Sequence, residues 1–181
     1  LSEALVSKGK KVVVLDNFND YYEPKRKWRN LESLKGKANF QLYEGDVRVR
    51  EHIRELMKNH QFEVVVHLAA MAGVRASIEN PLLYSEVNVM GTNLLLEEMR
   101  RAEINKLVFA SSSSVYGNRS EGAFSENDNT DRQISPYGAT KKASELLAHT
   151  YHHLFGMSCV GLRFFTVYGP RNRPDMACYK F

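Results

Sequence analysis

The alternation of short β-branched runs with longer segments of helical periodicity constrains the fold of this chain most. Strands are predicted at residues 11–15, 39–43, 63–67, 106–110 and 158–163. Helices are predicted between them at residues 24–35, 49–60, 81–102 and 136–155, and residues 1–8 have the pattern of the second half of an amphipathic helix. Near-continuous Val and Leu is typical of parallel strands covered on both faces. The alternation therefore predicts an α/β fold with a doubly wound parallel sheet.

Length and composition exclude several classes of protein. The 181 residues fit one domain of roughly 100–200 residues. The longest apolar stretch, residues 64–74, is interrupted by His67 and is shorter than the roughly 18 residues of a membrane-spanning helix, so no membrane contact is expected. The net charge is +4, but the basic run at residues 25–29 is more typical of a solvated helix face than of a nucleic-acid site.

Cysteines and histidines suggest neither a disulfide framework nor a metal site. Cys159 and Cys178 form neither a disulfide framework nor a CxxC pair. Reduced thiols and a cytoplasmic location are therefore expected. His149 and His153 are one helical turn apart, but no nearby acid or cysteine completes a ligand set, and no metal is expected.

Residues that follow the predicted strands carry the first hint of a ligand, because ligands of parallel sheets bind beyond the carboxyl ends of the strands. Asp16 stands where an acid accepts hydrogen bonds from an adenosine ribose and disfavours a 2′-phosphate, which predicts NAD rather than NADP; a turn cap is an equally open alternative. Asp46 is placed to accept from an adenine amino group. Residues 67–70 (His-Leu-Ala-Ala) end the next strand with small residues, which admit either a flat cofactor or tight packing of a helix on the sheet.

Tyr137 and Lys141 form the pattern that carries chemistry. They are four residues apart in a predicted helix, so both side chains project from one face. A neighbouring ammonium, with an oxidised nicotinamide ring, stabilises a phenolate that removes a proton from a sugar hydroxyl. The serine run 111–114 follows the strand at 106–110, where a hydroxyl can bridge the substrate oxygen and the phenol. A Tyr-x-x-x-Lys spacing is common by chance. The prediction of a catalytic group therefore rests on this spacing together with the serine run.

The residues together resemble the extended short-chain dehydrogenase/reductases that epimerise or dehydrate nucleotide sugars. The resemblance rests on Asp16, Gly45-Asp46, His67-Leu68-Ala69-Ala70, Asn88 within residues 87–92, Val115-Tyr116-Gly117 and residues 135–141. Within that group, residues 15–22, 72–75, 162–170 and 173–177 look like UDP-glucuronate 4-epimerases.

This resemblance implies a Rossmann-like fold, NAD as cofactor and a UDP-sugar as substrate. It implies the catalytic residues Ser112, Tyr137 and Lys141. The implied cofactor-binding residues are Asp16, Asn17, Asp46, Val47, Leu68, Ala69, Ala70, Asn88, Tyr137, Lys141 and Phe164. The implied substrate-binding residues are Ser112, Ser113, Ser114, Thr166 and Arg173, with Arg173 a candidate partner of a 6-carboxylate.

The implied reaction is interconversion of UDP-glucuronate and UDP-galacturonate at C4 through a 4-keto intermediate. Because such an intermediate beside a carboxylate can decarboxylate, a UDP-glucuronate decarboxylase is the nearest alternative, followed by other epimerases or dehydratases of nucleotide sugars. The 4,6-dehydratases of this type have Asp-Glu where Ser113 and Ser114 stand. The chain also departs from the family pattern at Arg171-Asn172, where Trp-Gly is usual, and at Val49, where an acid is usual.

The resemblance also implies that part of the whole protein is missing. A first strand and a glycine-rich turn are expected upstream of Leu1, so residues 1–163 are assigned to a partial NAD-binding domain and residues 164–181 to the start of a substrate-binding region. A homodimer is expected at full length. On this view residues 1–181 alone are expected to be inactive, and a non-catalytic interaction module is the alternative from another functional class.

Overall fold

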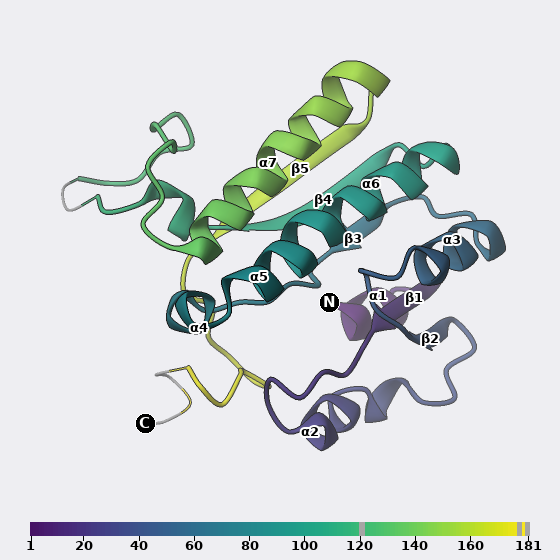
Figure 1. The fold of residues 1–181 in the computed structure, drawn as a ribbon. Coiled ribbons are helices and arrows are strands. Elements are labelled where there is room, and N and C mark those ends of the chain that lie inside the picture. The colour runs from purple at the N-terminus through teal and green to yellow at the C-terminus, as the bar shows by residue number, and fades with distance from the viewer. Residues whose placement is uncertain (120–121, 177–178, 180–181) are drawn as a thin grey trace. The chain divides into compact units, whose positions relative to one another are not determined.

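The computed structural model describes residues 1–119, 122–176 and 179 (Figure 1). By its internal contacts the chain forms two compact units, residues 1–46 with 166–181, and residues 47–165. The predicted division at residues 163/164 stays a prediction. Cys178 lies outside the described residues, whereas Cys159 is a free thiol.

The first unit contains a two-stranded parallel sheet. Its strands are β1 (Val12–Asp16) and β2 (Phe40–Glu44), paired from Val12↔Phe40 to Asp16↔Glu44. Its helices are α1 (Ser2–Ser7), α2 (Pro24–Arg29) and the 3-10 helix η1 (Glu32–Leu34). The helix predicted at the amino end is confirmed. The single helix predicted over residues 24–35 is wrong: α2 ends at Arg29, where Asn30, a residue of low helix propensity, is the C-cap, and a 3-10 turn follows.

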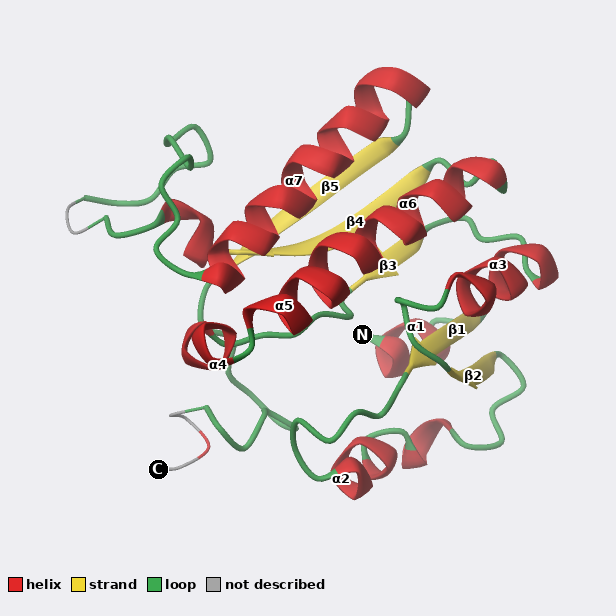
Figure 2. Cartoon of the chain, in the orientation of Figure 1, coloured by secondary structure: helices red, strands yellow, loops and turns green. Residues whose placement is uncertain are grey.

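The second unit contains a three-stranded parallel sheet in the order β3-β4-β5 (Figure 2). Its strands are β3 (Val65–His67), β4 (Lys106–Ser112) and β5 (Ser158–Phe164). Its helices are α3 (Arg50–Asn59), α4 (Val74–Glu79), α5 (Pro81–Tyr84), α6 (Gly91–Arg101) and α7 (Pro136–Phe155), with a 3-10 turn η3 (Ser113–Tyr116) after β4. All five predicted strands are present, and every pairing is parallel, as an α/β fold of this type requires.

Helix structure around residues 74–102 is richer than the sequence pattern predicted. The segment predicted as one helix is α5 and α6 joined by a π-helical stretch, η2 (Ser85–Met90). Helix α4 was not predicted at all. It follows Gly73, whose φ of 108° is open to glycine and disfavoured for other residues.

Helices α5, α6 and α7 cover one face of the three-stranded sheet, as Figure 1 shows. The core beneath them includes Leu107 and Phe109 of β4 and Leu96 of α6, all nearly inaccessible to solvent. On the outer strands Val66 and Val160 are 37% and 49% exposed. Within the described residues of this unit, these two valines are therefore only partly covered. None of the helices described combines the length and apolar character needed to cross a membrane.

Candidate active site

The amino end of α7 carries Tyr137 and approaches the turn after β4 closely. Ser135 caps the helix, because its Oγ accepts a hydrogen bond from the N–H of Gly138 at 3.0 Å. A Cβ on Gly138 would lie 2.7 Å from the carbonyl oxygen of Ser114, so only glycine allows this approach. The local sequence Ser-Pro-Tyr-Gly therefore brings Tyr137 to the carboxyl end of β4.

Lys141 lies one turn further along α7 and is 6% exposed. Its Nζ donates a hydrogen bond to the carbonyl oxygen of Ala110 on β4 at 2.8 Å. Burial lowers the pKa of Lys141 to about 8, which still leaves the ammonium mostly protonated at neutral pH. The ammonium is thus fixed between the strand and the helix, on the helix face that also carries Tyr137.

The serine run divides into residues with different partners. Ser112 ends β4 and its Oγ accepts a hydrogen bond from the N–H of Ser114 at 3.1 Å. Ser111 instead donates to Oε1 of Glu145 on α7 at 2.6 Å. Ser113 and Ser114 begin the η3 turn. Ser112 is therefore the hydroxyl at the strand end, and Ser111 joins strand to helix.

Asn88 links the loop after β3 to α7. It is 1% exposed, accepts from the N–H of Met71 at 2.8 Å, and donates to the carbonyl of Met71 and to Oγ1 of Thr140, both at 3.0 Å. Thr140 stands between Tyr137 and Lys141 and donates to the Tyr137 carbonyl. The Asn88 side chain thus makes three hydrogen bonds that connect the loop after β3 to α7.

The remaining candidate cofactor residues of this unit lie on the loop after β3, near the start of α6 and at the end of β5. Leu68 and Ala69 directly follow β3 and are exposed, and Ala70 is half-buried. Val47 packs against the start of α6, where a Cβ on Gly91 would lie 2.9 Å from its side chain. Phe164 ends β5 in register with Ser112 and is 42% exposed.

The first unit contains three of the predicted cofactor-binding residues, namely Asp16, Asn17 and Asp46. Asp16 ends β1 and is exposed, and its Oδ1 accepts from the N–H of Phe18 at 2.8 Å. Nδ2 of Asn17 donates to Oδ2 of Asp46 at 2.9 Å. The N–H of Gly45 donates to the carbonyl of Asp16 at 3.0 Å. Two carboxylates therefore follow the carboxyl ends of β1 and β2, and Asn17, next to Asp16, is hydrogen-bonded to Asp46.

Thr166 and Arg173 belong to the same unit as Asp16. Thr166 is exposed. Arg173 donates from its Nη2 to Oδ2 of Asp175 at 3.1 Å, and its guanidinium lies 5.4 Å from the centroid of the Tyr21 ring. Arg173 is thus already oriented by an acid and an aromatic ring.

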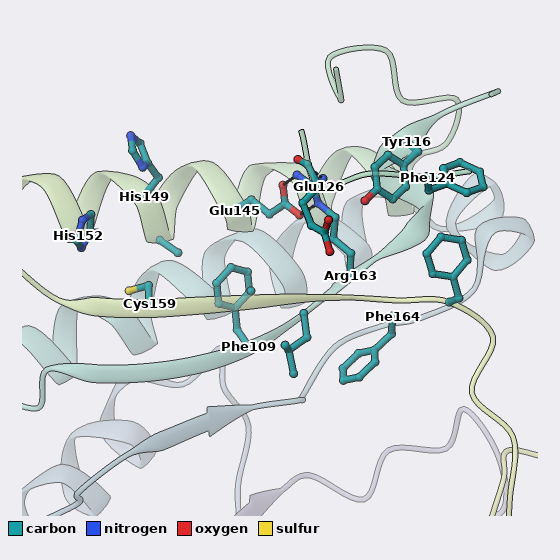
Figure 3. A pocket seen from close by; sticks show the side chains of 14 residues that line it. Phe109, Tyr116, Phe124, Glu126, Glu145, His149, His152, Cys159, Arg163 and Phe164 are labelled. Carbon is teal, nitrogen blue, oxygen red and sulfur yellow. Dashed lines mark hydrogen bonds and ion pairs between the residues drawn. The ribbon is translucent and has the colours of Figure 1, made fainter. Parts of the chain in front are cut away.

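Sequence reasoning missed Glu145 and Arg163, which form a bidentate ion pair between α7 and β5 (Figure 3). Arg163 donates from Nε and Nη2 to the two carboxylate oxygens of Glu145 at 2.9 and 3.0 Å. Burial raises the pKa of Glu145, but hydrogen bonds from Arg163 and Ser111 outweigh it and leave that pKa below its usual value. Two signals for this pair were present in the sequence. Glu145 follows Lys141 by four residues and so lies on the same helix face, and an arginine within an apolar strand needs an acidic partner when it is buried.

The ion pair lines a pocket of about 590 Å³ beside α7 and β5. Tyr116 and Phe124 stand together at one end of it (Figure 3), with ring centroids 4.9 Å apart. Among the described residues that line it, Phe164 is a predicted cofactor residue, but Ser112, Tyr137 and Lys141 are absent. The pocket is therefore distinct from the predicted catalytic group.

Parallel strands whose carboxyl ends carry Asp16, Asp46 and Ser112, with a Tyr-x-x-x-Lys helix beside β4, define a dinucleotide-binding α/β protein of the short-chain dehydrogenase/reductase type. A family model described as GDP-mannose 4,6 dehydratase matches residues 1–181. The chain belongs to this family of NAD-dependent epimerases and dehydratases.

Similar proteins place the chain near one branch of that family. UDP-glucuronate 4-epimerase of Thermodesulfobacterium geofontis is 44% identical over the whole chain, which covers 56% of that protein. UDP-glucuronate 4-epimerase 4 of Arabidopsis thaliana is 49% identical, with 100% of this chain and 41% of that protein covered. The chain thus spans about half the length of these curated relatives.

A solved structure agrees with these relatives. UDP-glucuronic acid 4-epimerase from Bacillus cereus, in complex with UDP-glucuronic acid and NAD, is 39% identical with a TM-score of 0.90. The match covers 98% of this chain and 56% of that one. The recognition and the fold class predicted from the sequence are confirmed.

Proposed function

We propose that the protein carrying this chain is an NAD-dependent UDP-sugar 4-epimerase that interconverts UDP-glucuronate and UDP-galacturonate. One observation carries the proposal: Tyr137 and Lys141 lie one turn apart on α7, and Lys141 is fixed to Ala110, two residues before Ser112. The Bacillus cereus epimerase, whose structure contains NAD and UDP-glucuronic acid, supports the cofactor and the substrate.

The residues present suit NAD. Asp16 and Asp46 offer carboxylate acceptors to ribose hydroxyls and an adenine amino group, and the Asn17–Asp46 hydrogen bond keeps the two strand ends together. Ala69 and Ala70 after β3 carry only methyl side chains, which leaves room for a flat cofactor. NAD, when bound, supplies the acceptor for the hydride that leaves the substrate carbon.

The chain's own residues move and hold protons. Tyr137 removes the proton of the 4-hydroxyl and returns it after the sugar has turned over, because a base is needed in each direction. Lys141 stabilises the phenolate by its charge. Ser112 donates a hydrogen bond to the reacting oxygen, which keeps the 4-keto sugar oriented.

Substrate selection is assigned to a second set of residues. The hydroxyls of Ser113, Ser114 and Thr166 bind the sugar, and Arg173 pairs with the 6-carboxylate. A guanidinium suits this role because it meets both carboxylate oxygens in one plane. Asp175 and Tyr21, which already contact Arg173, hold it for the substrate.

The whole protein is further proposed to be a cytoplasmic homodimer. Exposed apolar side chains on α7 support the dimer, namely Leu146, Leu154 and Phe155 at 55%, 61% and 46% exposure. The free thiol of Cys159 supports a reducing compartment.

Product analysis tests the activity. Purified protein is incubated with NAD and UDP-glucuronate, and the nucleotide sugars are separated and identified. The proposal expects UDP-galacturonate as the product. UDP-xylose with carbon dioxide would instead identify a decarboxylase, and an unchanged substrate would favour a non-catalytic role.

Tyr137→Phe is the matched variant for this assay. Loss of the phenol should lower turnover by roughly two to four orders of magnitude, the range for a general acid/base, while NAD still binds. The control is Tyr151→Phe on the same helix. Near-normal epimerisation by Tyr137→Phe would remove Tyr137 from the chemistry.

A further inference from the structure

Phe18 has a backbone conformation that its side chain disfavours. Its φ is +47°, in the left-handed region that bulky residues rarely adopt. The side chain is 7% exposed and stacks on Trp28 of α2, with ring centroids 3.9 Å apart and planes 9° from parallel. Strain of this kind persists only where contacts hold it, and it concentrates at functional sites.

The backbone of the strained residue Phe18 is hydrogen-bonded to the side chain of Asp16. The N–H of Phe18 donates to Oδ1 of Asp16 at 2.8 Å, and the N–H of Asn19 donates to Oδ1 of Asn17 at 3.1 Å. Asn17 in turn donates to Asp46. The path of the chain through Phe18 therefore sets where the Asp16 carboxylate lies.

Helix α2 holds this turn at two consecutive positions. Trp28 stacks on Phe18, and Nζ of Lys27 donates to both the carbonyl and Oδ1 of Asn19 at 2.6 Å. Burial lowers the pKa of Lys27, whereas the charge of Asp16 acts in the opposite direction. The helix thus clamps the turn by a ring stack and by a cation.

We propose that Trp28, acting through Phe18, is a positioning residue that holds Asp16 where it selects a free ribose 2′-hydroxyl over a 2′-phosphate. The inference rests on the proposed function, which assigns Asp16 to the adenosine ribose. A fixed carboxylate accepts from the ribose hydroxyls and repels a phosphate. A carboxylate that can tilt away from the ribose accepts these hydrogen bonds less well and repels a 2′-phosphate less strongly.

Two variant pairs separate the ring stack from the rest of the fold. Trp28→Ala removes the stack, and Trp28→Phe retains a ring. Phe18→Ala removes the stack but keeps a Cβ that disfavours the positive φ, whereas Phe18→Gly removes both the ring and that penalty. Affinities for NAD and NADP are measured by titration calorimetry on the protein carrying this chain.

The ratio of the two affinities is the readout, since general loss of stability does not change it. Trp28→Ala and Phe18→Ala are expected to lower the preference for NAD by about tenfold, the effect of one hydrogen bond to a charged group. Trp28→Phe and Phe18→Gly are expected to retain most of it. Because Trp28 is 36% exposed, Trp28→Ala remains informative even where Phe18→Ala fails to fold.

Asp16→Asn distinguishes failure of this inference from failure of the proposed function. If Asp16→Asn abolishes the preference while Trp28→Ala leaves it unchanged, the positioning role is overturned and the ribose assignment stands. An Asp16→Asn protein with an unchanged preference overturns the ribose assignment itself, and the positioning role falls with it.

Discussion

At the scale of single residues, His67 shows how burial near the site affects a titratable group. His67 ends β3, is 8% exposed, and its Nε2 lies 3.1 Å from Oγ1 of Thr92. Burial, together with the charge of Lys141, lowers the pKa of His67 from 6.5 to about 4. The imidazole is therefore neutral in the folded protein at any pH where an exposed histidine begins to charge.

This depressed pKa predicts a loss of stability in mild acid. Between pH 7 and 5 the unfolded chain binds a proton at His67 that the folded chain does not, so the free energy of unfolding falls by about 2 kcal/mol. Urea denaturation at both pH values measures the change. His67→Asn should abolish this pH-dependent fall in the free energy of unfolding. His149→Asn, at an exposed position of α7, should leave the fall unchanged. An identical pH dependence in wild type and His67→Asn would contradict the account.

At the scale of elements, the Glu145–Arg163 pair links α7, which carries Tyr137 and Lys141, to β5 of the sheet. Both side chains are less than one-fifth exposed. The guanidinium also donates to the carbonyl of Glu126 and lies 5.0 Å from the centroid of the Tyr116 ring. Because Ser111 donates to the same carboxylate, the pair joins α7, β4 and β5 at one point.

A double-mutant cycle measures that connection. Glu145→Gln and Arg163→Met, singly and together, are compared by their free energies of unfolding. Each single variant leaves a partly buried charge without its partner and should cost about 2–4 kcal/mol. The coupling energy should be about 1–3 kcal/mol. Strictly additive losses would show that the two side chains do not depend on each other.

The same elements show what the sequence could and could not predict. Strand positions and α7 followed from local periodicity, because β-branched runs and the Ser-Pro start of a helix are short-range signals. Helix α4 was not predicted, because a six-residue segment after a glycine is too short to show a helical periodicity. The hydrogen-bond partners of Asn88 and Arg163 were not predictable either, because Met71 and Glu145 are 17 and 18 residues away and meet them only in the folded chain.

At the scale of the whole molecule, the open face of the three-stranded sheet dominates the behaviour expected of these residues on their own. Val160 and Leu162 on β5 are 49% and 39% exposed, and Val66 on β3 is 37% exposed. Apolar side chains gathered on an uncovered sheet face favour association with other surfaces.

Residues 1–181 produced alone should therefore self-associate. Light scattering after size exclusion is expected to give a mass above that of a single 20.7 kDa chain. Val160→Thr with Leu162→Thr, which keeps strand propensity but lowers apolar exposure, should reduce the mass. A monodisperse monomer with a cooperative thermal transition would refute this expectation.

The central claim is that the protein carrying this chain oxidises C4 of its substrate and returns the same hydride to the other face. UDP-glucuronate labelled with deuterium at C4 tests it most directly, with the product examined by NMR. The account predicts UDP-galacturonate that retains deuterium at C4, because hydride held on the bound cofactor does not exchange with water. UDP-galacturonate that has lost its deuterium to solvent would contradict the account.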